Sequence, residues 1–277
     1  MITRRATDQG VTFLDVETPL CTATLCLQGA HLTSWKPEGQ EECLFLSPNA
    51  VFAPGKAIRG GIPVCWPWFG PRKGEPSHGV ARTSEWRLHH QETDKRGNAL
   101  LSLAFYPEDE SPAAILRLAL GRTLAMKLET TARMQPCKLT EAFHNYFAVG
   151  NLTKCRVHGL DDVPFREEAA QPMKHGERPL APLGCLDRVY DCPACSGKIV
   201  LEDFVLNRAI TVERDHASSV IIWNPGQQGA GNMADLGAES WNKFLCVEMG
   251  NADSRCIPLA SGQSHTLCQK ITVGPLE

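Results

Sequence analysis

The sequence predicts an all-β protein built as a large antiparallel β-sandwich, and two observations support this prediction. Segments of strand length recur along nearly the whole chain, separated by turn residues. Helix-period patterns of ten residues or more are missing, as are a GxGxxG after a strand and a Walker-type loop, which argues against nucleotide-binding α/β folds. Because no composition shift marks a linker, we expect a single domain over residues 1–277.

The expected strands follow one another with short connections. In the first half they fall within residues 11–18, 21–35, 85–92, 99–106, 114–120 and 124–134. Leucines at 116, 118 and 120 alternate with Arg117 and Ala119, as in an antiparallel strand with one buried face. In the second half the expected strands cover residues 139–149, 154–160, 186–191, 198–204, 209–215, 218–224, 244–250 and 265–273. Only residues 232–244 leave room for a turn or two of helix.

Charge and hydropathy limit the partners. The 28 Lys and Arg nearly balance the 31 Asp and Glu, for a formal charge of -3, so no global field favours nucleic acid or anionic lipid. The N-terminus lacks the apolar run of a secretion signal, and no later stretch approaches the ~20 apolar residues of a membrane span. We expect a cytoplasmic protein that binds neither nucleic acid nor membrane.

The twelve cysteines do not indicate a disulfide framework, because nothing in the sequence exports the chain. Most lie in apolar or alternating segments, where a free thiol acts as a small hydrophobe. Cys192 and Cys195 form a lone CxxC without the second CxxC of a zinc ribbon or the βαβ context of a redox motif. We therefore expect no metal, no stoichiometric zinc and no essential role for this pair.

The stretch from Arg59 to Arg82 is rich in glycine, proline and aromatic residues and suits neither a helix nor a regular strand. We expect a long ordered loop, and such loops in compact domains are usually functional. Its aromatic rings suit a flat or sugar-like ligand, and Arg72, Lys73 and the two terminal arginines suit an anion. The alternative is a structural crossing loop with solvated basic residues.

Three titratable residues are candidates for chemistry. In a strand over residues 139–149, His144 would share a face with Ala142 and Tyr146, and histidine titrates nearest neutrality. Glu248 follows an apolar run, so it lies either at the end of a sheet in water or in a desolvated site that raises its pKa. Asp187 forms either part of a site or a surface ion pair with the adjacent arginine.

Six motifs in order over nearly the whole chain carry a resemblance: RGGIPVCWPWFGP, PSHGVAR, EAFHNYF, LDRVY, VIIWNPG and FLCVEMG. Over roughly Leu20 to Val273 the chain closely resembles the glucose-6-phosphate 1-epimerase (hexose-6-phosphate mutarotase) group of the aldose 1-epimerase family. The resemblance implies a galactose mutarotase-like β-supersandwich. It also implies interconversion of the α and β anomers of an aldose by acid/base-catalysed ring opening and reclosure, without a metal or organic cofactor. For this group the expected aldose is a hexose 6-phosphate, in the first place glucose 6-phosphate.

The resemblance also implies roles at the reacting end of the sugar. His144 matches the general acid, Glu248 the general base, His78 a second motif histidine at the ring and Asp187 the carboxylate that binds a sugar hydroxyl. The motifs read HNY where HTY is more usual and EMG after the base. These departures affect the shape of the pocket rather than the roles.

The resemblance assigns the cations to the phosphate. Arg59 matches the arginine before the paired glycines, which lines the phosphate site, and Arg82 occupies another motif position. Arg72 or Lys73 lies where a further cation tends to fall, in a loop of variable length.

In the implied mechanism, Glu248 takes a proton from the anomeric hydroxyl and His144 gives one to the ring oxygen. We expect the two groups to converge from opposite sides of the sugar across a concave sheet face. Three alternatives stay open: a non-catalytic carbohydrate-binding module, a glycosidase with two carboxylates about the scissile bond, and an aldose 1-epimerase acting on unphosphorylated sugars.

Overall fold

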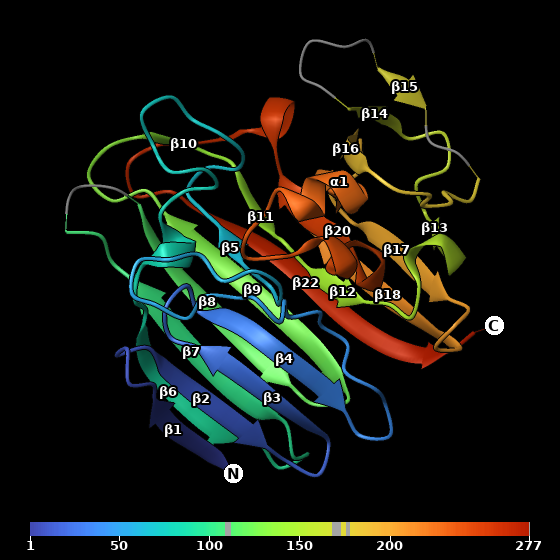
Figure 1. The fold of residues 1–277 in the computed structure, drawn as a ribbon. Coiled ribbons are helices and arrows are strands. Elements are labelled where there is room, and N and C mark those ends of the chain that lie inside the picture. Colours follow the sequence, from blue (N-terminus) through green and yellow to red (C-terminus); the bar gives the residue numbers. More distant parts are fainter. Residues whose placement is uncertain (109–111, 168–172, 176–177, 277) are drawn as a thin grey trace.

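The computed structural model describes residues 1–108, 112–167, 173–175 and 178–276. These residues form antiparallel sheets in two layers, as the sequence predicts. The back layer is one large sheet of long strands, and two further sheets, one of four strands and one of eight mostly shorter strands, lie side by side in front of it (Figure 1). The helices are short, and no helix among the described residues has the length and apolar character needed to cross a membrane.

The large sheet has eight strands with long, regular pairing. Its order is β13 (Cys155–His158), β17 (Gly197–Asp203), β18 (Arg208–Asp215), β22 (Ser264–Pro275), β9 (Thr123–Thr131), β8 (Ala113–Leu120), β7 (Ala99–Phe105) and β6 (Arg87–Thr93). Leu116, Leu118 and Leu120 of β8 are buried while Arg117 is exposed, so the alternation expected there is confirmed.

A four-stranded meander covers one half of the large sheet (Figure 1). Its strands are β1 (Ile2–Ala6), β2 (Thr12–Glu17), β3 (Cys21–Cys26) and β4 (His31–Pro37). The indole of Trp35 on β4 donates a hydrogen bond of 3.2 Å to the carbonyl of Gly121, beyond the end of β8. This contact ties the two layers together at the edge of the core.

The other front sheet carries the candidate site. Its order is β15 (Lys174–His175), β14 (Pro164–Arg166), β16 (Leu186–Asp191), β19 (Ser219–Asn224), β20 (Phe244–Asn251), β11 (Glu141–Phe143) and β5 (Val64–Cys65), with β12 (Tyr146–Ala148) also paired to β20. A separate two-stranded ladder joins β10 (Cys137–Leu139) to β21 (Ile257–Leu259).

The helical segments differ from the expectation. The α-helix α1 (Gly226–Gly231) begins before residue 232, and only the 3₁₀ helix η3 (Ala238–Lys243) lies within the expected window. The other 3₁₀ helices are η1 (Ala81–Thr83), η2 (Leu152–Lys154) and η4 (Asp253–Arg255). A six-residue helix rich in glycine has no recognisable 3.6-residue apolar pattern, which is why the sequence did not reveal α1.

The main hydrophobic core lies between the layers and runs through the chain from Leu14 to Ile271. The meander, the back sheet and the site sheet all contribute buried side chains to it: Leu14 and Leu25 from the meander, Leu116, Leu128 and Ile271 from the back sheet, and Val220, Val247 and Met249 from the site sheet. One face of the site sheet is thereby fixed, and its other face is turned toward the site.

Candidate active site

A cleft of about 640 Å³ opens on the face of the site sheet that points away from the main core. Alternation along three neighbouring strands supplies its floor: Asp187 and Val189 from β16, Ile221 and Trp223 from β19, and Glu248 from β20. Asp187 pairs with Trp223 across β16 and β19, and Ile221 with Glu248 across β19 and β20. The volume falls within the range of small-molecule sites.

Glu248 lies inside β20 rather than at its end, which corrects the expectation of a carboxylate closing a strand. Its residue exposure is 1%, and Met249 still pairs with Phe143 on the next strand. Burial raises the pKa of Glu248 well above its usual value, the charge of Asp187 raises it further, and Arg82 opposes the shift. The carboxyl is therefore held away from bulk water in a site that favours its neutral form.

His144 lies in a two-residue break between β11 and β12, so the expected continuous strand over residues 139–149 is wrong at this point. The backbone N–H of His144 donates to the carbonyl of Pro63 at 3.0 Å, which continues the register of β11 on β5 by one residue beyond the end of both strands. The expected division of faces nevertheless holds, because the imidazole stacks on Tyr146 at 4.7 Å between centroids while Phe143 and Phe147 enter the core. The register on β20 is the same before and after the break, with Phe143 opposite Met249 and Tyr146 opposite Cys246, so His144 lies beside Glu248.

The imidazole of His144 and the carboxyl of Glu248 are direct neighbours, with 3.4 Å between Nδ1 and Oε1. Burial lowers the pKa of His144 well below its usual value, and electrostatic interactions with His78, Arg82 and Arg59 lower it further. The two shifts together favour a neutral carboxyl beside a neutral imidazole. Acid–base catalysis requires a carboxylate beside an imidazolium, and this ion pair carries the same number of protons as the neutral pair. Transfer of one proton from the carboxyl to the imidazole therefore converts the neutral pair into the ion pair.

The His78 imidazole faces His144 edge-on, with ring centroids 5.9 Å apart. Its Nδ1 accepts a hydrogen bond from the backbone N–H of Gly70 at 3.3 Å. Burial lowers the pKa of His78 to about 3, with Arg82 and Arg59 as further causes. A neutral ring that accepts at Nδ1 carries its hydrogen on Nε2, so His78 can donate to an oxygen in the cleft.

A close approach of two backbones fixes the position of His78. Gly79 has φ +76°, and a Cβ there would lie 1.9 Å from the carbonyl oxygen of Trp66. His78 itself has φ +63°, in the left-handed region that a residue with a side chain seldom adopts. Only glycine fits at position 79. The packing of this glycine against Trp66 holds His78 in its strained conformation at the wall of the cleft.

Arg59 lines the cleft but has two protein partners. Its Nε pairs with Asp235 Oδ2 at 3.1 Å, and its Nη1 donates to the hydroxyl of Tyr146 at 3.1 Å. Among the described residues no acceptor is bonded to Nη2. The next residue, Gly60, has φ +108°, and a Cβ there would lie 2.4 Å from the carbonyl of Phe45. Gly60 lets the backbone after Arg59 pass close to Phe45, and the contacts with Asp235 and Tyr146 fix the orientation of the guanidinium.

The cations of the long loop separate into two groups. Arg82 lines the cleft, and its Nη2 donates to the carbonyl of Ser77 at 2.6 Å. Arg72 and Lys73 are exposed and are not part of the cleft lining, and the Arg72 guanidinium instead lies 5.0 Å from the ring centroid of Trp68. The structure thus brings Arg59 and Arg82 to the candidate site and leaves the other two cations outside it.

The aromatic residues of the loop also divide. Phe69 lines the cleft and contacts the His78 ring edge-on at 4.9 Å. Trp66 is fully buried in the main core, where its indole donates to the hydroxyl of Thr130 at 2.9 Å. The expectation that all three rings form a site wall is therefore wrong, because the loop also has to close the sandwich. The ordered-loop prediction is confirmed, with only β5 and η1 as regular structure.

Asp187 contributes a second carboxyl to the cleft. Burial raises its pKa, and the charge of Asp253 adds to the shift. The surface ion pair considered from the sequence is not formed, because the adjacent Arg188 bonds through Nε to Glu167 at 3.2 Å. Asp253 also lines the cleft and pairs with Arg166 at 3.2 Å.

Sequence reasoning did not identify three of the residues that shape the site: Trp223, Asp235 and Asp253. Trp223 had a signal, because it is the aromatic residue of the strand-length motif VIIWNPG. Asp235 and Asp253 had none, since Asp235 lies in a turn and Asp253 in the three-residue 3₁₀ helix η4, and each pairs with an arginine far away in the sequence.

Comparison with known proteins identifies the family of the chain. The family model described as aldose 1-epimerase matches residues 14–272. A candidate glucose-6-phosphate 1-epimerase from Escherichia coli strain K12 is 39% identical over 267 residues, covering 91% of this chain and 87% of that protein.

Solved structures extend the comparison to the fold. A candidate mutarotase from Salmonella typhimurium superposes with a TM-score of 0.89 at 33% identity, covering 99% of this chain and 94% of that one. A galactose mutarotase-like protein from Clostridium acetobutylicum, at 15% identity, has a TM-score of 0.67 over 100% of this chain and 99% of its own, which shows a shared fold. The sandwich, the match over most of the chain and the level of identity together show that this protein belongs to the aldose 1-epimerase family.

Proposed function

We propose that this protein interconverts the α and β anomers of a hexose 6-phosphate, with glucose 6-phosphate as the first substrate to test. The observation that carries the proposal is the buried pair of His144 and Glu248 on the floor of a cleft that Arg59 and Arg82 also line. The names of the similar proteins from Escherichia coli and Salmonella support the same reaction.

In the proposed reaction, Glu248 removes the proton of the anomeric hydroxyl while His144 protonates the ring oxygen. The bond between C1 and the ring oxygen then breaks, the aldehyde rotates about the C1–C2 bond, and reclosure on its other face reverses both proton transfers. The two oxygens that exchange protons are both bonded to C1. A donor and an acceptor that lie side by side can therefore serve them, and groups on opposite sides of the sugar, as first expected, are not needed.

The pair starts with the proton it needs. Burial favours the neutral carboxyl and the neutral imidazole. Arg82 acts in the opposite direction on Glu248, because it lowers the pKa of the carboxyl and so favours the carboxylate. Moving one proton from carboxyl to imidazole produces the base and the acid together.

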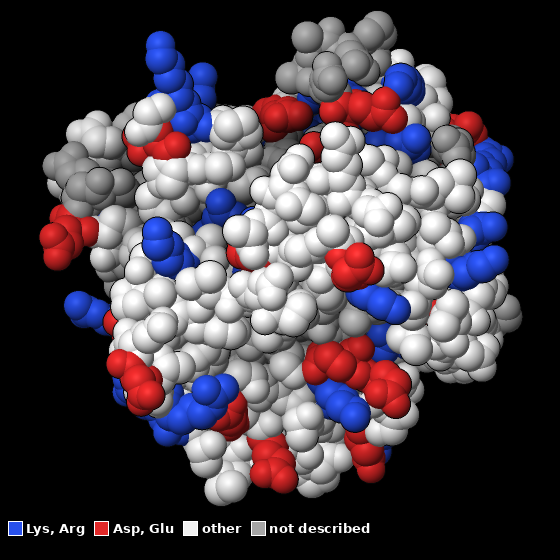
Figure 2. Space-filling view, viewed as in Figure 1, with Lys and Arg blue, Asp and Glu red and all other residues white. Residues whose placement is uncertain are grey.

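The cations suit a phosphate dianion remote from the reacting carbon. Arg59 is anchored by Asp235 and Tyr146, so its free Nη2 donors are already oriented, and Arg82 adds a second guanidinium. Arginine matches phosphate oxygens in charge and geometry. The face seen in Figure 2 has cations and anions interspersed without a broad basic area, so anion binding there has to be local.

We further propose that residues 1–277 act as one domain, since the main core joins strands from Leu14 to Ile271. The remaining cleft residues would bind sugar hydroxyls and ring faces: Asp187, His78, Trp223 and Phe69. Arg72 and Lys73 remain proposed phosphate contacts only if their loop closes over the substrate.

Polarimetry separates the proposal from its rivals. A freshly dissolved anomer of glucose 6-phosphate should lose its excess rotation faster with the protein than without it. A carbohydrate-binding module would leave the spontaneous rate unchanged, and a glycosidase would release sugar from an aryl glycoside, which this protein should leave intact. An equal acceleration for free glucose would indicate an aldose 1-epimerase without phosphate specificity.

A further inference from the structure

A second cluster of reactive side chains lies on the surface, outside the cleft. Cys195 belongs to the turn between β16 and β17, Asp215 is the last residue of β18, and His216 follows it. All three are exposed, and their thiol, carboxylate and imidazole ligand atoms lie within 4.8 Å of one another. We propose that these three residues form an exchangeable binding site for a zinc-like divalent cation.

The donor set selects the class of metal. Thiolate, imidazole and carboxylate are the side chains that bind Zn²⁺, whereas Ca²⁺ and Mg²⁺ prefer oxygen alone. Zinc–ligand bonds of about 2.0–2.3 Å place the ligand atoms of a tetrahedral ion roughly 3.3–3.8 Å apart. Asp215 Oδ2 and His216 Nε2 are already 3.7 Å apart. Rotation of the exposed Cys195 side chain would bring its sulfur to the same distance from the other two ligand atoms.

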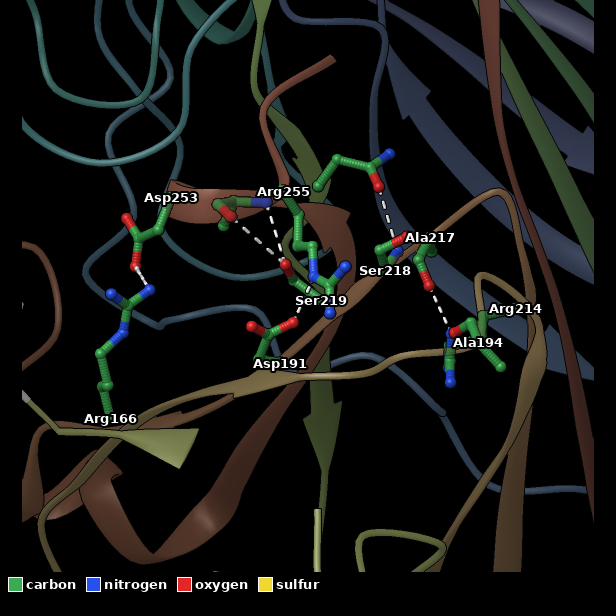
Figure 3. A network of polar contacts seen from close by, with 11 residues as sticks. Arg166, Asp191, Ala194, Arg214, Ala217, Ser218, Ser219, Asp253 and Arg255 are labelled. Atoms are coloured by element: carbon green, nitrogen blue, oxygen red, sulfur yellow. Dashed lines mark hydrogen bonds and ion pairs between the residues drawn. The ribbon is translucent and has the colours of Figure 1, made fainter. Parts of the chain in front are cut away.

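The backbone of the cluster is organised before any metal binds. The N–H of Ala217 donates to the carbonyl of Cys195 at 2.8 Å. The Arg214 guanidinium donates through Nη1 to the carbonyl of Ala194 at 2.7 Å and also to that of Ala217 (Figure 3). These bonds join two turns that are far apart in the sequence, so metal binding does not have to order them.

Further contacts hold His216 in place. Its carbonyl accepts a hydrogen bond from Asn251 Nδ2 at 2.8 Å, and its own N–H donates to Asp215 Oδ1 at 3.0 Å. The imidazole meets His265 edge-on, with centroids 6.1 Å apart. One carboxylate oxygen of Asp215 is thus engaged locally, and the other is the one that faces His216.

The CxxC motif is not the site, because Cys192 is 2% exposed and is not part of the cluster. Three protein ligands leave a fourth position for water, and the nearby positive charge of Arg214 opposes a dication. We expect an ion that exchanges and is lost on purification, so the proposal departs from the expectation of no metal but keeps that of no stoichiometric zinc. The inference does not depend on the proposed catalytic function.

The test is a titration of the full-length, chelator-treated protein with Co²⁺, followed by displacement with Zn²⁺. The wild-type protein should bind one Co²⁺ with a thiolate-to-cobalt charge-transfer band that Zn²⁺ abolishes. Cys195→Ser should remove the band. His216→Asn should weaken binding at least about tenfold, since even outer partners of metal ligands contribute 10–100-fold. Asparagine tolerates the φ of +55° at this position.

Matched controls use an exposed cysteine and an exposed histidine elsewhere: Cys185→Ser and His90→Asn should bind Co²⁺ like the wild type. Thermal unfolding without metal should confirm that all four variants are folded. A wild-type titration without a thiolate band, or a band that survives Cys195→Ser and disappears in Cys185→Ser, would refute the site.

Discussion

His144 Nδ1 lies 3.4 Å from Glu248 Oε1, in a cleft floor where neither residue exceeds 7% exposure. The contact joins a break between two short strands to the interior of β20, so the site depends on the packing of the whole sheet. Neither buried Nδ1 nor the other carboxyl oxygen, Oε2, has a hydrogen-bond partner among the described residues. A pair left this incompletely satisfied is costly to the fold, as is typical of groups retained for chemistry.

Replacing either member of the pair should abolish most of the activity. His144→Asn and Glu248→Gln should each lower kcat for glucose 6-phosphate by about 10²-fold or more, the usual contribution of positioned proton transfer. The double variant should be little worse than either single one, because the two groups act as a unit. Progress curves of anomer exchange measure all three, and near-normal turnover in a single variant would remove that residue from the mechanism.

Glu248→Gln should also stabilise the protein at neutral pH. Burial raises the pKa of Glu248 in the folded chain. Its contribution to stability is therefore complete below the unfolded pKa of about 4.3 and is lost as the pH rises through the raised folded value. Glutamine does not titrate, so the Tm of the variant minus that of the wild type should grow as the pH increases above about 4.3. Thermal unfolding at several pH values checks this, and a constant or shrinking difference would contradict a raised pKa.

The all-β class and nearly every long strand could be predicted from the sequence, because alternation and turn residues are local signals. The failures have physical causes. Residues 139–149 read as one strand, yet His144 gives its backbone hydrogen bond to Pro63, and only tertiary structure reveals that partner. Helix α1 has too few residues and too many glycines to show a period.

Site residues within recognisable motifs could be predicted, and their mutual geometry could not. The sequence identified His144 and Glu248 but could not show that they are neighbours, since that depends on β20 lying beside the break. It also could not separate Arg82, which lines the cleft, from Arg72, which packs on Trp68. Both are arginines in the same loop, and only the path of the backbone distinguishes them.

The two cleft arginines should act mainly on the phosphate. Arg82→Ala and Arg59→Ala should each raise KM for glucose 6-phosphate much more than for glucose, because the lost contact is remote from the reacting carbon. Steady-state kinetics with both sugars measures the change in KM for each of them. Some loss of kcat is expected if the phosphate also positions the ring.

Arg72→Ala and Lys73→Ala are the matched controls, since both residues lie in the same loop but outside the cleft lining. Their KM values should change less than that of Arg82→Ala. A larger effect in either control would show that the loop closes over the phosphate. Equal increases in KM for both sugars in Arg82→Ala would contradict a phosphate role for that residue.

Asp235 should act as a positioning residue through Arg59. Asp235→Asn removes the charge from the 3.1 Å contact with the arginine Nε and keeps the shape. We expect a higher KM for glucose 6-phosphate with kcat for glucose unchanged, and a smaller effect than that of Arg59→Ala. In an Arg59→Ala background the Asp235→Asn change should add little to KM, and full additivity would mean that the two residues act independently.

The thiols should be dispensable for catalysis. Cys195→Ser should keep the wild-type kcat, because the residue is exposed and lies outside the cleft. Cys192→Ser tests a buried position, where burial raises the pKa of the thiol and a hydroxyl replaces a small apolar group. It should lower Tm without lowering kcat of the folded protein. A loss of turnover in either folded variant would overturn this expectation.

Two-dimensional NMR exchange spectroscopy on equilibrated glucose 6-phosphate tests the proposed reaction most directly, because it observes both anomers without a coupling enzyme. With catalytic amounts of wild-type protein, cross-peaks between the α and β anomeric signals should appear at mixing times where buffer alone gives none. They should be absent with folded Glu248→Gln and weaker for glucose than for its 6-phosphate. Exchange that stays at the spontaneous rate with the wild-type protein, or that persists undiminished in Glu248→Gln, would contradict the proposed function.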